Sequence, residues 1–363
     1  MGKRKKVTTR DIAEALGISQ STVSMILSGR PNVSFTEETI LQVQNAAKNM
    51  GYQKSNPKGD KKRDRFSESI AVLCPQLSGG YYSMMLHSII KRAMRYHYTV
   101  FTITTFRSAQ TEKRYLEMLE NTRLAGIISL YPVSEVAMMN LLSRQVPVIS
   151  VGDKPSAFQF DAVELDSLKP GHLIGNYLIS LGHTHITYVS SPINKKEIGR
   201  AHRLEGVKNS FLEHGYPAEQ IDVLYQSQSA FEQYPAENAE YQNAYDLTLE
   251  TLKRGTPSTT FIGNNDIAAF GIMAAISDFG ARIPQDYSVC GFDNIALSSM
   301  PQISLTTVEH ASVQKGEEAV DMIFKKNSQN HQNGQPNYII RLEFEPKLIV
   351  RNSTGKCKNL IPE

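Results

Sequence analysis

Cysteine is scarce in this 363-residue chain, and long apolar runs are missing from it. The three cysteines, Cys74, Cys290 and Cys357, lie far apart and form no Cys-x-x-Cys or Cys/His pairing. This spacing argues against a disulfide framework and a zinc site, and it fits a reducing compartment such as the cytoplasm. No stretch approaches the ~18 consecutive apolar residues that a membrane helix needs. The basic opening, residues 3–6, is followed by polar residues, so we expect neither a signal peptide nor a membrane segment.

The charge is distributed unevenly along the chain. Residues 1–66 contain 13 Lys/Arg and 6 Asp/Glu, whereas the whole chain has a net charge of only +3, so the remainder is mildly acidic. A basic head on an acidic body is expected of a nucleic-acid-binding module joined to another domain. A basic, solvated tail would give the same charge, so the pattern within the head has to decide. The length predicts two or three domains in total.

The head has the pattern of two short amphipathic helices joined by a tight turn. Gly17 stands where the first helix has to end, and Ser19 offers an oxygen that can cap the second helix. Thr8 or Thr9 is expected to cap the first helix. The arrangement predicts a helix-turn-helix. Its apolar positions at helical spacing are Ile12, Ala13 and Leu16, followed by Val23, Ile26 and Leu27.

The second helix, about Gln20–Ser28, carries short polar side chains suited to a major groove. Such side chains near a helix N-terminus reach phosphates and base edges. A third helix is expected from about Glu37 to Met50, capped by Thr36 or by Ser34. The alternative is a helical hairpin that caps another domain, but the turn glycine, the polar face and the charge together favour DNA binding. The polar face consists of Gln20, Ser21, Thr22 and Ser24.

The body alternates apolar runs of strand length with helical stretches. Nearly continuous hydrophobic strands separated by helices indicate parallel sheets that are covered on both faces. The length of this alternation exceeds one comfortable sheet, so we expect two α/β lobes. The predicted strands are residues 70–74, 98–103, 126–130, 147–151, 186–190, 259–262 and 287–292.

Polar residues that follow these strands are the candidate ligand contacts, because open parallel sheets bind ligands at the carboxyl ends of their strands. Aromatic, carboxylate, amide and Arg side chains from both halves fit a cleft that closes on a small polar ligand. Two alternatives stay open: Arg203 and Asp293 can pair with each other, and Asp266 can be structural as a helix cap. The candidates include Tyr81, Tyr82, Asp153, Arg200, Arg203, Asn264, Asn265, Asp293 and Asn294.

The head resembles the DNA-binding headpiece of the lactose/galactose-repressor (LacI/GalR) family of bacterial transcription regulators. The motifs Asp-Ile-Ala, Gly-Ile-Ser, Ser-Thr-Val-Ser and Pro-Asn-Val-Ser stand in the family order between residues 7 and 34. The resemblance implies that Gln20, Ser21 and Met25 read base edges, while Thr22 and Ser24 hold the helix on the DNA backbone. Further candidate DNA contacts are Thr8, Ser19, Ser28 and Arg30.

Three departures from the family pattern affect this interpretation. Met25 replaces a usual Arg and offers only an apolar contact, for instance to a thymine methyl group. Two residues, Phe35 and Thr36, are inserted before the third helix. The family's hinge helix, with its Leu wedge, is replaced by a basic segment that contains Pro57 and Gly59. We therefore expect a flexible linker that contacts phosphates without kinking DNA.

The resemblance extends over about residues 7–353 and implies a body with the fold of periplasmic sugar-binding proteins, whose chain crosses between two lobes three times. It matches Arg203, Asn265 and Asp293 to residues that hold effector hydroxyls or charged groups. Asp153 matches a cleft carboxylate, and Tyr81 and Tyr82 match an aromatic pair at the cleft mouth. The expected divisions are a headpiece 1–53, a linker 54–67, a ligand-binding and dimerisation domain 68–353 (first lobe about 68–164 and 298–325, second lobe about 165–297 and 330–353) and a tail 354–363.

Together these features predict a cytoplasmic, homodimeric DNA-binding regulator, most simply a repressor, that binds a near-palindromic operator and is controlled by a sugar or sugar derivative. No cofactor, metal or membrane is expected, and no nucleophile elbow, phosphate loop or retained carboxylate pair suggests an enzyme. One alternative is a solute receptor with a vestigial head. Another is a regulator whose effector is a partner protein or a phosphorylated sugar.

Overall fold

The structure is a computed structural model that describes residues 7–28, 35–50, 52, 67–77, 79–152, 158–193, 198–333 and 338–358. The chain divides into two units, Met1–Arg63 and Asp64–Glu363, and each is described by itself. The first unit contains three helices: α1 (Thr9–Leu16), α2 (Gln20–Ser28) and α3 (Glu37–Asn49).

Local capping explains where α1 begins and ends and where α2 begins. Thr8 and Asp11 form a capping box, in which the Asp11 N–H donates to Thr8 Oγ1 (3.3 Å) and the Thr8 N–H donates to Asp11 Oδ2 (2.7 Å). Gly17 ends α1 in the left-handed conformation, with φ of 66°. The Thr22 N–H then donates to Ser19 Oγ (3.0 Å), which caps α2. The predicted turn and its caps are confirmed.

The three helices enclose a small apolar core. Ala13 is buried together with Ile12 of α1, Val23 of α2 and Val43 of α3. The small side chain of Ala13 permits close packing between the helices. Thr36 caps α3 by accepting a hydrogen bond from the Thr39 N–H (3.4 Å).

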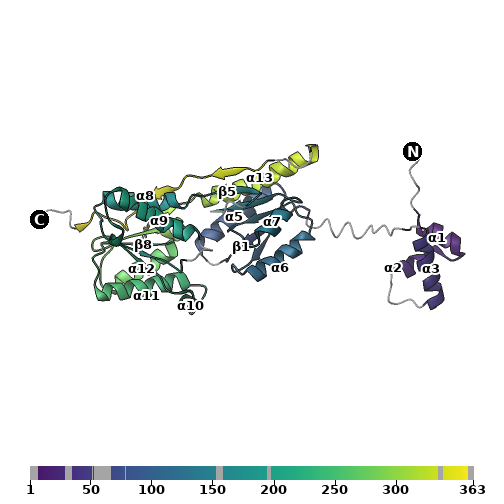
Figure 1. Ribbon diagram of the computed structural model, residues 1–363, viewed down its shortest axis with the longest axis horizontal. Coiled ribbons are helices and arrows are strands. Elements are labelled where there is room, and N and C mark those ends of the chain that lie inside the picture. Colours follow the sequence, from purple (N-terminus) through teal and green to yellow (C-terminus); the bar gives the residue numbers. More distant parts are fainter. Residues whose placement is uncertain are drawn as a thin grey trace. The chain divides into compact units, whose positions relative to one another are not determined.

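The second unit contains two six-stranded sheets (Figure 1). The strand order is β11-β5-β4-β3-β1-β2 in the first sheet and β12-β10-β9-β8-β6-β7 in the second. All paired strands described are parallel except β10 with β12. The strands are β1 (Ser69–Cys74), β2 (Thr99–Thr104), β3 (Gly126–Ser129), β4 (Val148–Val151), β5 (Asp161–Glu164), β6 (Ile186–Val189), β7 (Ile221–Leu224), β8 (Thr260–Gly263), β9 (Ser288–Phe292), β10 (Thr306–Glu309), β11 (Arg341–Glu343) and β12 (Lys347–Ile349).

Helices cover both faces of each sheet, so each lobe has two apolar cores. In lobe 1, the first sheet with its helices, α5 and α13 pack on one face and α6 and α7 on the other. In lobe 2, the second sheet with its helices, α8 and α9 cover one face and α11 and α12 the other. The helices are α5 (Gly80–Arg95), α6 (Ala109–Glu120), α7 (Val136–Leu142), α8 (Leu168–Ser180), α9 (Ile198–Glu213), α10 (Gln228–Phe231), α11 (Ala239–Arg254), α12 (Asp266–Asp278) and α13 (Ser312–Asn333), with short 3-10 turns η2 (Ala218–Gln220) and η3 (Ala296–Ser299).

The chain passes between the lobes three times, after β5, after β10 and between β11 and β12. The predicted lobe boundaries are wrong at two places. β10 was expected in the first lobe but pairs with β9, and β11 was expected in the second lobe but pairs with β5. Both strands are short. The strand with which each one pairs is determined by contacts between residues far apart in the sequence, and the local sequence pattern does not reveal them. The two-lobed α/β fold itself is confirmed.

No helix in the described part of the chain is long and apolar enough to cross a membrane.

Candidate functional site

Helix α2 presents an uncharged polar face. Gln20, Ser21 and Ser24 are exposed, whereas Thr22 and Met25 are half-buried. Gln20 Nε2 donates to Thr9 Oγ1 (3.2 Å), so one end of its amide is held by α1. Ser19 Oγ lies 2.7 Å from Ser21 Oγ, within a network of hydroxyl groups at the start of the helix. This network orients short donors and acceptors outward at the helix N-terminus.

Some predicted DNA contacts have structural roles or lie outside the described residues. Thr8 caps α1 and its side chain is bonded to Asp11 (2.8 Å), so it serves the helix start. Ser19 likewise caps α2. The side chain of Ser28, all of Arg30 and the linker residues 53–66 fall outside the described part. Their contacts with DNA remain predictions.

In lobe 1, the predicted aromatic pair opens α5, directly after β1. The rings of Tyr81 and Tyr82 meet edge-on, with their centroids 5.2 Å apart. Arg107 Nη2 donates to the Tyr82 hydroxyl (2.9 Å). Lys315, fully buried on α13, donates from Nζ to the Tyr81 hydroxyl (3.3 Å). Two cations therefore border the aromatic pair, and sequence reasoning missed both of them.

In lobe 2, Arg203 and Asp293 pair with each other, which was one of the two alternatives that the sequence left open. Arg203 Nη2 donates to Asp293 Oδ1 (3.3 Å), and Nη1 donates to the Asn264 carbonyl oxygen (2.7 Å). The guanidinium carbon lies 5.2 Å from the centroid of the Phe292 ring, at cation–π distance. Asp293 has φ of 112°, a strained conformation that the turn after β9 imposes. The turn and the arginine together fix the position of this carboxylate.

His310 links the two groups of residues. It follows β10 of lobe 2, its ring stacks over Phe292 (6.3 Å), and it meets the Tyr81 ring of lobe 1 edge-on (6.3 Å). Its Nε2 lies 3.5 Å from Asp293 Oδ1. Burial first, and then the positive charge of Arg203, lower the pKa of His310 to about 4, although Asp293 acts in the opposite direction. His310 is therefore neutral at pH 7 and was not among the predicted site residues.

The lobes also touch beside this histidine. A Cβ at Gly80 would lie 2.6 Å from the Ile295 side chain. Gly80 begins α5, which follows β1, and Ile295 follows β9, so the carboxyl ends of these two strands face each other across the lobe boundary. This is the arrangement that the sequence predicts for the ligand-binding residues.

The cap of α12 is Asn265, and not Asp266 as the sequence suggested. Asn265 caps α12, since its Oδ1 accepts from the Ala268 N–H (2.8 Å), while its Nδ2 donates to Glu240 Oε2 (2.6 Å). Asp266 is structural but is not the cap. The role of Asn265 as an effector contact remains a prediction, and its amide is already held from two sides.

Asp266 anchors the loop that carries the site. It accepts hydrogen bonds from the Ile295 N–H (2.9 Å), the Ser298 hydroxyl (2.6 Å) and the Thr307 hydroxyl (2.5 Å). Burial, followed by the negative charge of Asp293, raises the pKa of Asp266 to about 7, against the effect of these three donors. A Cβ at Gly291 would lie 2.4 Å from Asp266 Oδ1, so glycine is needed there to admit the carboxylate.

Several buried polar atoms near the carboxyl ends of the lobe 2 strands make no hydrogen bond within the described part. Ser190 and Ser191 follow β6, and Asn264 follows β8. Their positions directly after strands were a signal that the sequence offered, but only Asn264 was considered. Buried polar groups are normally paired, so these atoms need a water or ligand partner. They are Ser190 Oγ, Ser191 Oγ, both amide atoms of Asn264, Asn243 Oδ1 and Tyr188 Oη.

Two further predicted cleft residues are Asp153 and Arg200. Asp153 lies outside the described residues, so its role as a cleft carboxylate remains a prediction. Arg200 pairs with Glu240 (2.8 Å), which also holds Asn265. Glu240 therefore connects α9 to the start of α12.

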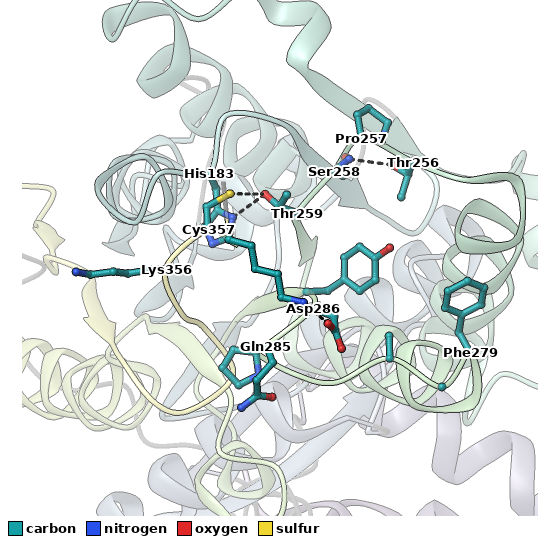
Figure 2. A pocket seen from close by; sticks show the side chains of 15 residues that line it. His183, Thr256, Pro257, Ser258, Thr259, Phe279, Gln285, Asp286, Lys356 and Cys357 are labelled. Carbon is teal, nitrogen blue, oxygen red and sulfur yellow. Dashed lines mark hydrogen bonds and ion pairs between the residues drawn. The ribbon is translucent and has the colours of Figure 1, made fainter. Parts of the chain in front are cut away.

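A pocket of about 510 Å³ lies at the opposite edge of the lobe 2 sheet, at the amino ends of β8 and β9 (Figure 2). In Figure 2 the side chains of His183 and Cys357 converge on Thr259. His183 Nδ1 bonds to Thr259 Oγ1 (2.7 Å), and its Nε2 donates to the Gly355 carbonyl oxygen (3.0 Å). Because this pocket lies at the amino ends of the strands, it is not the predicted ligand site.

The fold and these residues agree with a family match. The family described as periplasmic binding proteins and sugar binding domain of LacI family matches residues 67–344. The chain belongs to the LacI family of transcription regulators. The match covers both lobes, including Tyr81, Arg203, Asp293 and His310.

Curated relatives extend this similarity to the headpiece. The chain is 28% identical over 349 residues to the HTH-type transcriptional repressor PurR of Haemophilus influenzae, covering 95% of this chain and 98% of that protein. It is 26% identical over 354 residues to the HTH-type transcriptional regulator DegA of Bacillus subtilis, covering 96% and 98%.

Solved structures share the fold of this LacI-family protein. A LacI family transcriptional regulator from Enterococcus faecium with bound ribose has a TM-score of 0.67 and 24% identity, covering 80% of this chain and 100% of that one. The transcriptional regulator CelR in complex with cellobiose has a TM-score of 0.65 and 19% identity, covering 96% and 100%.

Proposed function

We propose that this LacI-family protein is a transcription repressor that binds a near-palindromic operator as a homodimer and responds to a small sugar-like effector between its lobes. The observation that carries the DNA-binding part is the capped α1–turn–α2 arrangement, with Gln20, Ser21 and Ser24 exposed on an uncharged helix face. Uncharged side chains of this length reach base edges when the helix lies in the major groove. We further propose that the protein acts in the cytoplasm and is not an enzyme.

The effector part is supported by groups from both lobes. Tyr81 offers an aromatic face, Arg203 and Asp293 offer charged donors and acceptors, and the buried hydroxyls after β6 offer hydrogen bonds. A polyhydroxylated ligand would satisfy these atoms, and the similar Enterococcus faecium and CelR structures contain ribose and cellobiose. Closure of the lobes on such a ligand would alter how paired headpieces are spaced, a coupling worth ~1–3 kcal/mol in typical allosteric proteins.

The test is a selection of bound duplexes from a randomised DNA library by the full-length protein. We expect a near-palindrome whose half-sites are about one helical turn apart. A sugar panel is then screened by thermal unfolding, and each stabilising sugar is added to the protein–DNA complex. A change in DNA affinity of at least about fivefold supports effector control.

Two results would redirect the interpretation. A protein that selects no sequence at low salt but binds a sugar would be a solute receptor with a vestigial head. A protein that selects an operator but responds to no small molecule would have a partner protein as its effector.

A further inference from the structure

We propose that Phe106 is a further effector contact, whose ring stacks on a second ring of the effector at the outer end of the lobe boundary. The effector is then longer than a single sugar ring. This inference rests on the proposed function, because it specifies the ligand of the same site. It is supported by the exposure and backbone of Phe106, by the fixed position of its neighbours and by the order of the strands.

Phe106 combines an exposed side chain with a strained backbone. It lies in the turn between β2 and α6 and is 76% exposed. Its φ is 51° and that of Arg107 is 53°, so two consecutive residues other than glycine adopt the left-handed conformation. This conformation is costly for bulky residues, and such strain is concentrated at functional sites. Neither feature stabilises the folded lobe, so a role in binding accounts for both.

The turn that carries Phe106 is held in place from both sides. The Phe106 N–H donates to a carbonyl oxygen directly after β1 (3.0 Å). The Thr105 hydroxyl donates to the Tyr131 hydroxyl (2.7 Å), and Arg107 Nη2 donates to the Tyr82 hydroxyl (2.9 Å). The side chains on either side of Phe106 therefore contact lobe 1, while Phe106 itself is exposed beside the aromatic pair at the start of α5. A ring fixed in this way is preorganised for a ligand.

The strand order places Phe106 at the edge of the lobe boundary that the chain crossings leave open. β2 ends the first sheet and β7 ends the second, whereas β5, β11, β10 and β12, which flank the crossings, lie toward the other ends. Because β2 is parallel to β1, its carboxyl end faces lobe 2 as that of β1 does. Figure 1 shows the yellow connection between the lobes at the top, and α10, which follows β7, at the bottom. We call the side of the boundary at β2 and β7 the open edge.

A ligand that contacts both Asp293 and Phe106 has to be long. Asp293 follows β9, and β8, β6 and β7 come next in order toward the open edge. Neighbouring strands lie about 4.8 Å apart, so the ends of β9 and β7 are separated by roughly 14 Å. Between them, the buried side chains of Asn264 after β8 and Ser190 after β6 make no hydrogen bond within the described part. One sugar ring beside Asp293 does not reach the open edge, whereas a second linked ring does.

The chemistry of Phe106 specifies what the second ring presents. A phenyl ring offers a large apolar surface and gains free energy when that surface leaves water. The flat C–H face of a pyranose and the face of an aromatic aglycone both match it. Ligand sites are lined mainly by apolar and aromatic groups, with a few polar groups that fix orientation. Phe106 thus forms the apolar outer wall, and the polar groups after β6, β8 and β9 orient the first ring.

The first measurement compares one-ring and two-ring ligands on the full-length protein by calorimetry. The probes are D-glucose with cellobiose and phenyl β-D-glucoside, and D-galactose with lactose and phenyl β-D-galactoside. At least one two-ring probe is expected to bind at least about tenfold more tightly than its one-ring partner. The disaccharides and the phenyl glycosides distinguish a sugar face from an aromatic aglycone.

Variants at Phe106 assign this preference to its ring. Phe106→Asn removes the ring, and asparagine accepts the left-handed conformation. It should lower the preference to about twofold or less, because the apolar contact is lost, and leave the affinity for the one-ring probe unchanged. Phe106→Tyr should keep the preference. Phe279→Asn is the matched control, since Phe279 is also exposed (43%) but lines the pocket at the opposite edge of the lobe 2 sheet.

A tryptophan reporter tests the contact directly. The chain has no tryptophan, so Phe106→Trp gives a protein with a single one. Its emission should shift to shorter wavelength when a two-ring probe binds, because stacking removes the indole from water, and should stay constant when the one-ring partner binds. Phe279→Trp should respond to neither probe.

The proposal is overturned if no two-ring probe binds more tightly than its one-ring partner, if Phe106→Asn keeps the full preference, or if both probes shift the emission of Phe106→Trp equally. The proposed function is judged separately by DNA binding. A one-ring sugar that changes operator affinity without any contact at Phe106 would remove only this inference, whereas absence of sequence-specific DNA binding would remove the proposed function.

Discussion

At the scale of single residues, we predict that Met25 helps to determine which bases α2 reads. The helix Gln20–Ser28 has no Lys, Arg, Asp or Glu, so it lacks the bidentate guanine contact that an arginine provides. Gln pairs well with adenine, and an apolar side chain contacts the thymine methyl group. We therefore expect A·T pairs at the positions that α2 faces.

Replacing Met25 by Arg is expected to change this preference. DNA selection with Met25→Arg should recover guanine at one position of each half-site where the wild type selects thymine. Replacing that thymine by deoxyuridine, which removes only the methyl group, should weaken wild-type binding by about threefold to tenfold, consistent with a contact worth ~1 kcal/mol. Identical selected sequences for both proteins would show that Met25 does not face a base.

His310 is expected to make the folded protein less stable as the pH falls. Its pKa is about 4 in the folded protein, below the ordinary value of about 6.5. The stability contributed by its neutral form is fully present above about pH 6.5 and is lost as the pH falls toward 4, because the unfolded chain takes up the proton first. Asp266, with a raised pKa, acts in the opposite direction over part of this range.

The prediction for His310 compares how much unfolding free energy the wild type and a variant lose when the pH falls. Asp266 is present in both proteins, so its contribution cancels in the difference. Between pH 7.5 and pH 5, the wild type should lose about 2 kcal/mol more unfolding free energy than His310→Asn, which does not titrate. Denaturant unfolding at the two pH values measures this. Parallel losses in both proteins would mean that His310 is not held neutral.

Only some residues of the candidate site could be predicted from the sequence, and the reason is physical. Arg203 and Asp293 follow strands that have a strong apolar pattern. They were identified because parallel sheets bind ligands at the carboxyl ends of their strands. Lys315 and His310 follow β10, at the second connection between the lobes, where β10 pairs with β9 over a few residues only. Without that long-range pairing, the sequence gives no reason to place them beside Tyr81.

At the scale of elements, the crossing of α8 and α9 positions Arg203. A Cβ at Gly206 would lie 2.1 Å from the Leu168 carbonyl oxygen, and one at Gly171 would lie 2.0 Å from the Arg203 carbonyl oxygen. Both contacts are with backbone atoms, which have little freedom to move. The two glycines therefore set how closely α9 approaches α8.

Gly206→Ala is expected to destabilise lobe 2 by at least about 2 kcal/mol, since overpacking outweighs the gain of roughly 1 kcal/mol in helix propensity. It should also weaken effector binding, because α9 carries Arg203. Chemical denaturation measures the first effect, and sugar-induced thermal shifts measure the second. Glu205→Ala, at an exposed position of the same helix, is the matched control and should change neither by much. Equal stability of the two variants would contradict the packing argument.

The regular elements were predictable where their local pattern is strong. The apolar runs at 70–74, 126–130 and 186–190 correspond to β1, β3 and β6, and the caps of α1 and α2 follow from Thr8, Gly17 and Ser19. Strands β5, β7, β10, β11 and β12 were missed. They have three or four residues each, with polar side chains among the apolar ones, so no continuous apolar run marks them, and their pairing partners stabilise them.

At the scale of the whole molecule, the charge asymmetry predicts salt-sensitive DNA binding. Residues 1–66 contain 13 Lys/Arg against 6 Asp/Glu; six of these cations lie in the linker, and four of the six are clustered at Lys61, Lys62, Arg63 and Arg65. Affinity should fall at least about tenfold between 50 and 200 mM salt. Replacing these four residues by Gln should flatten the salt dependence without changing the selected sequence. An unchanged slope would mean that the linker does not contact phosphates.

The most direct measurement is the affinity of the double variant Gln20→Ala, Ser21→Ala for the duplex selected by the wild type and for a scrambled duplex. The two side chains are exposed at the start of α2, and Ser19, which caps this helix, is left unchanged. The account predicts that the variant loses at least about thirtyfold in its preference for the selected duplex, while its weak binding to the scrambled duplex persists. An unchanged preference would contradict the account.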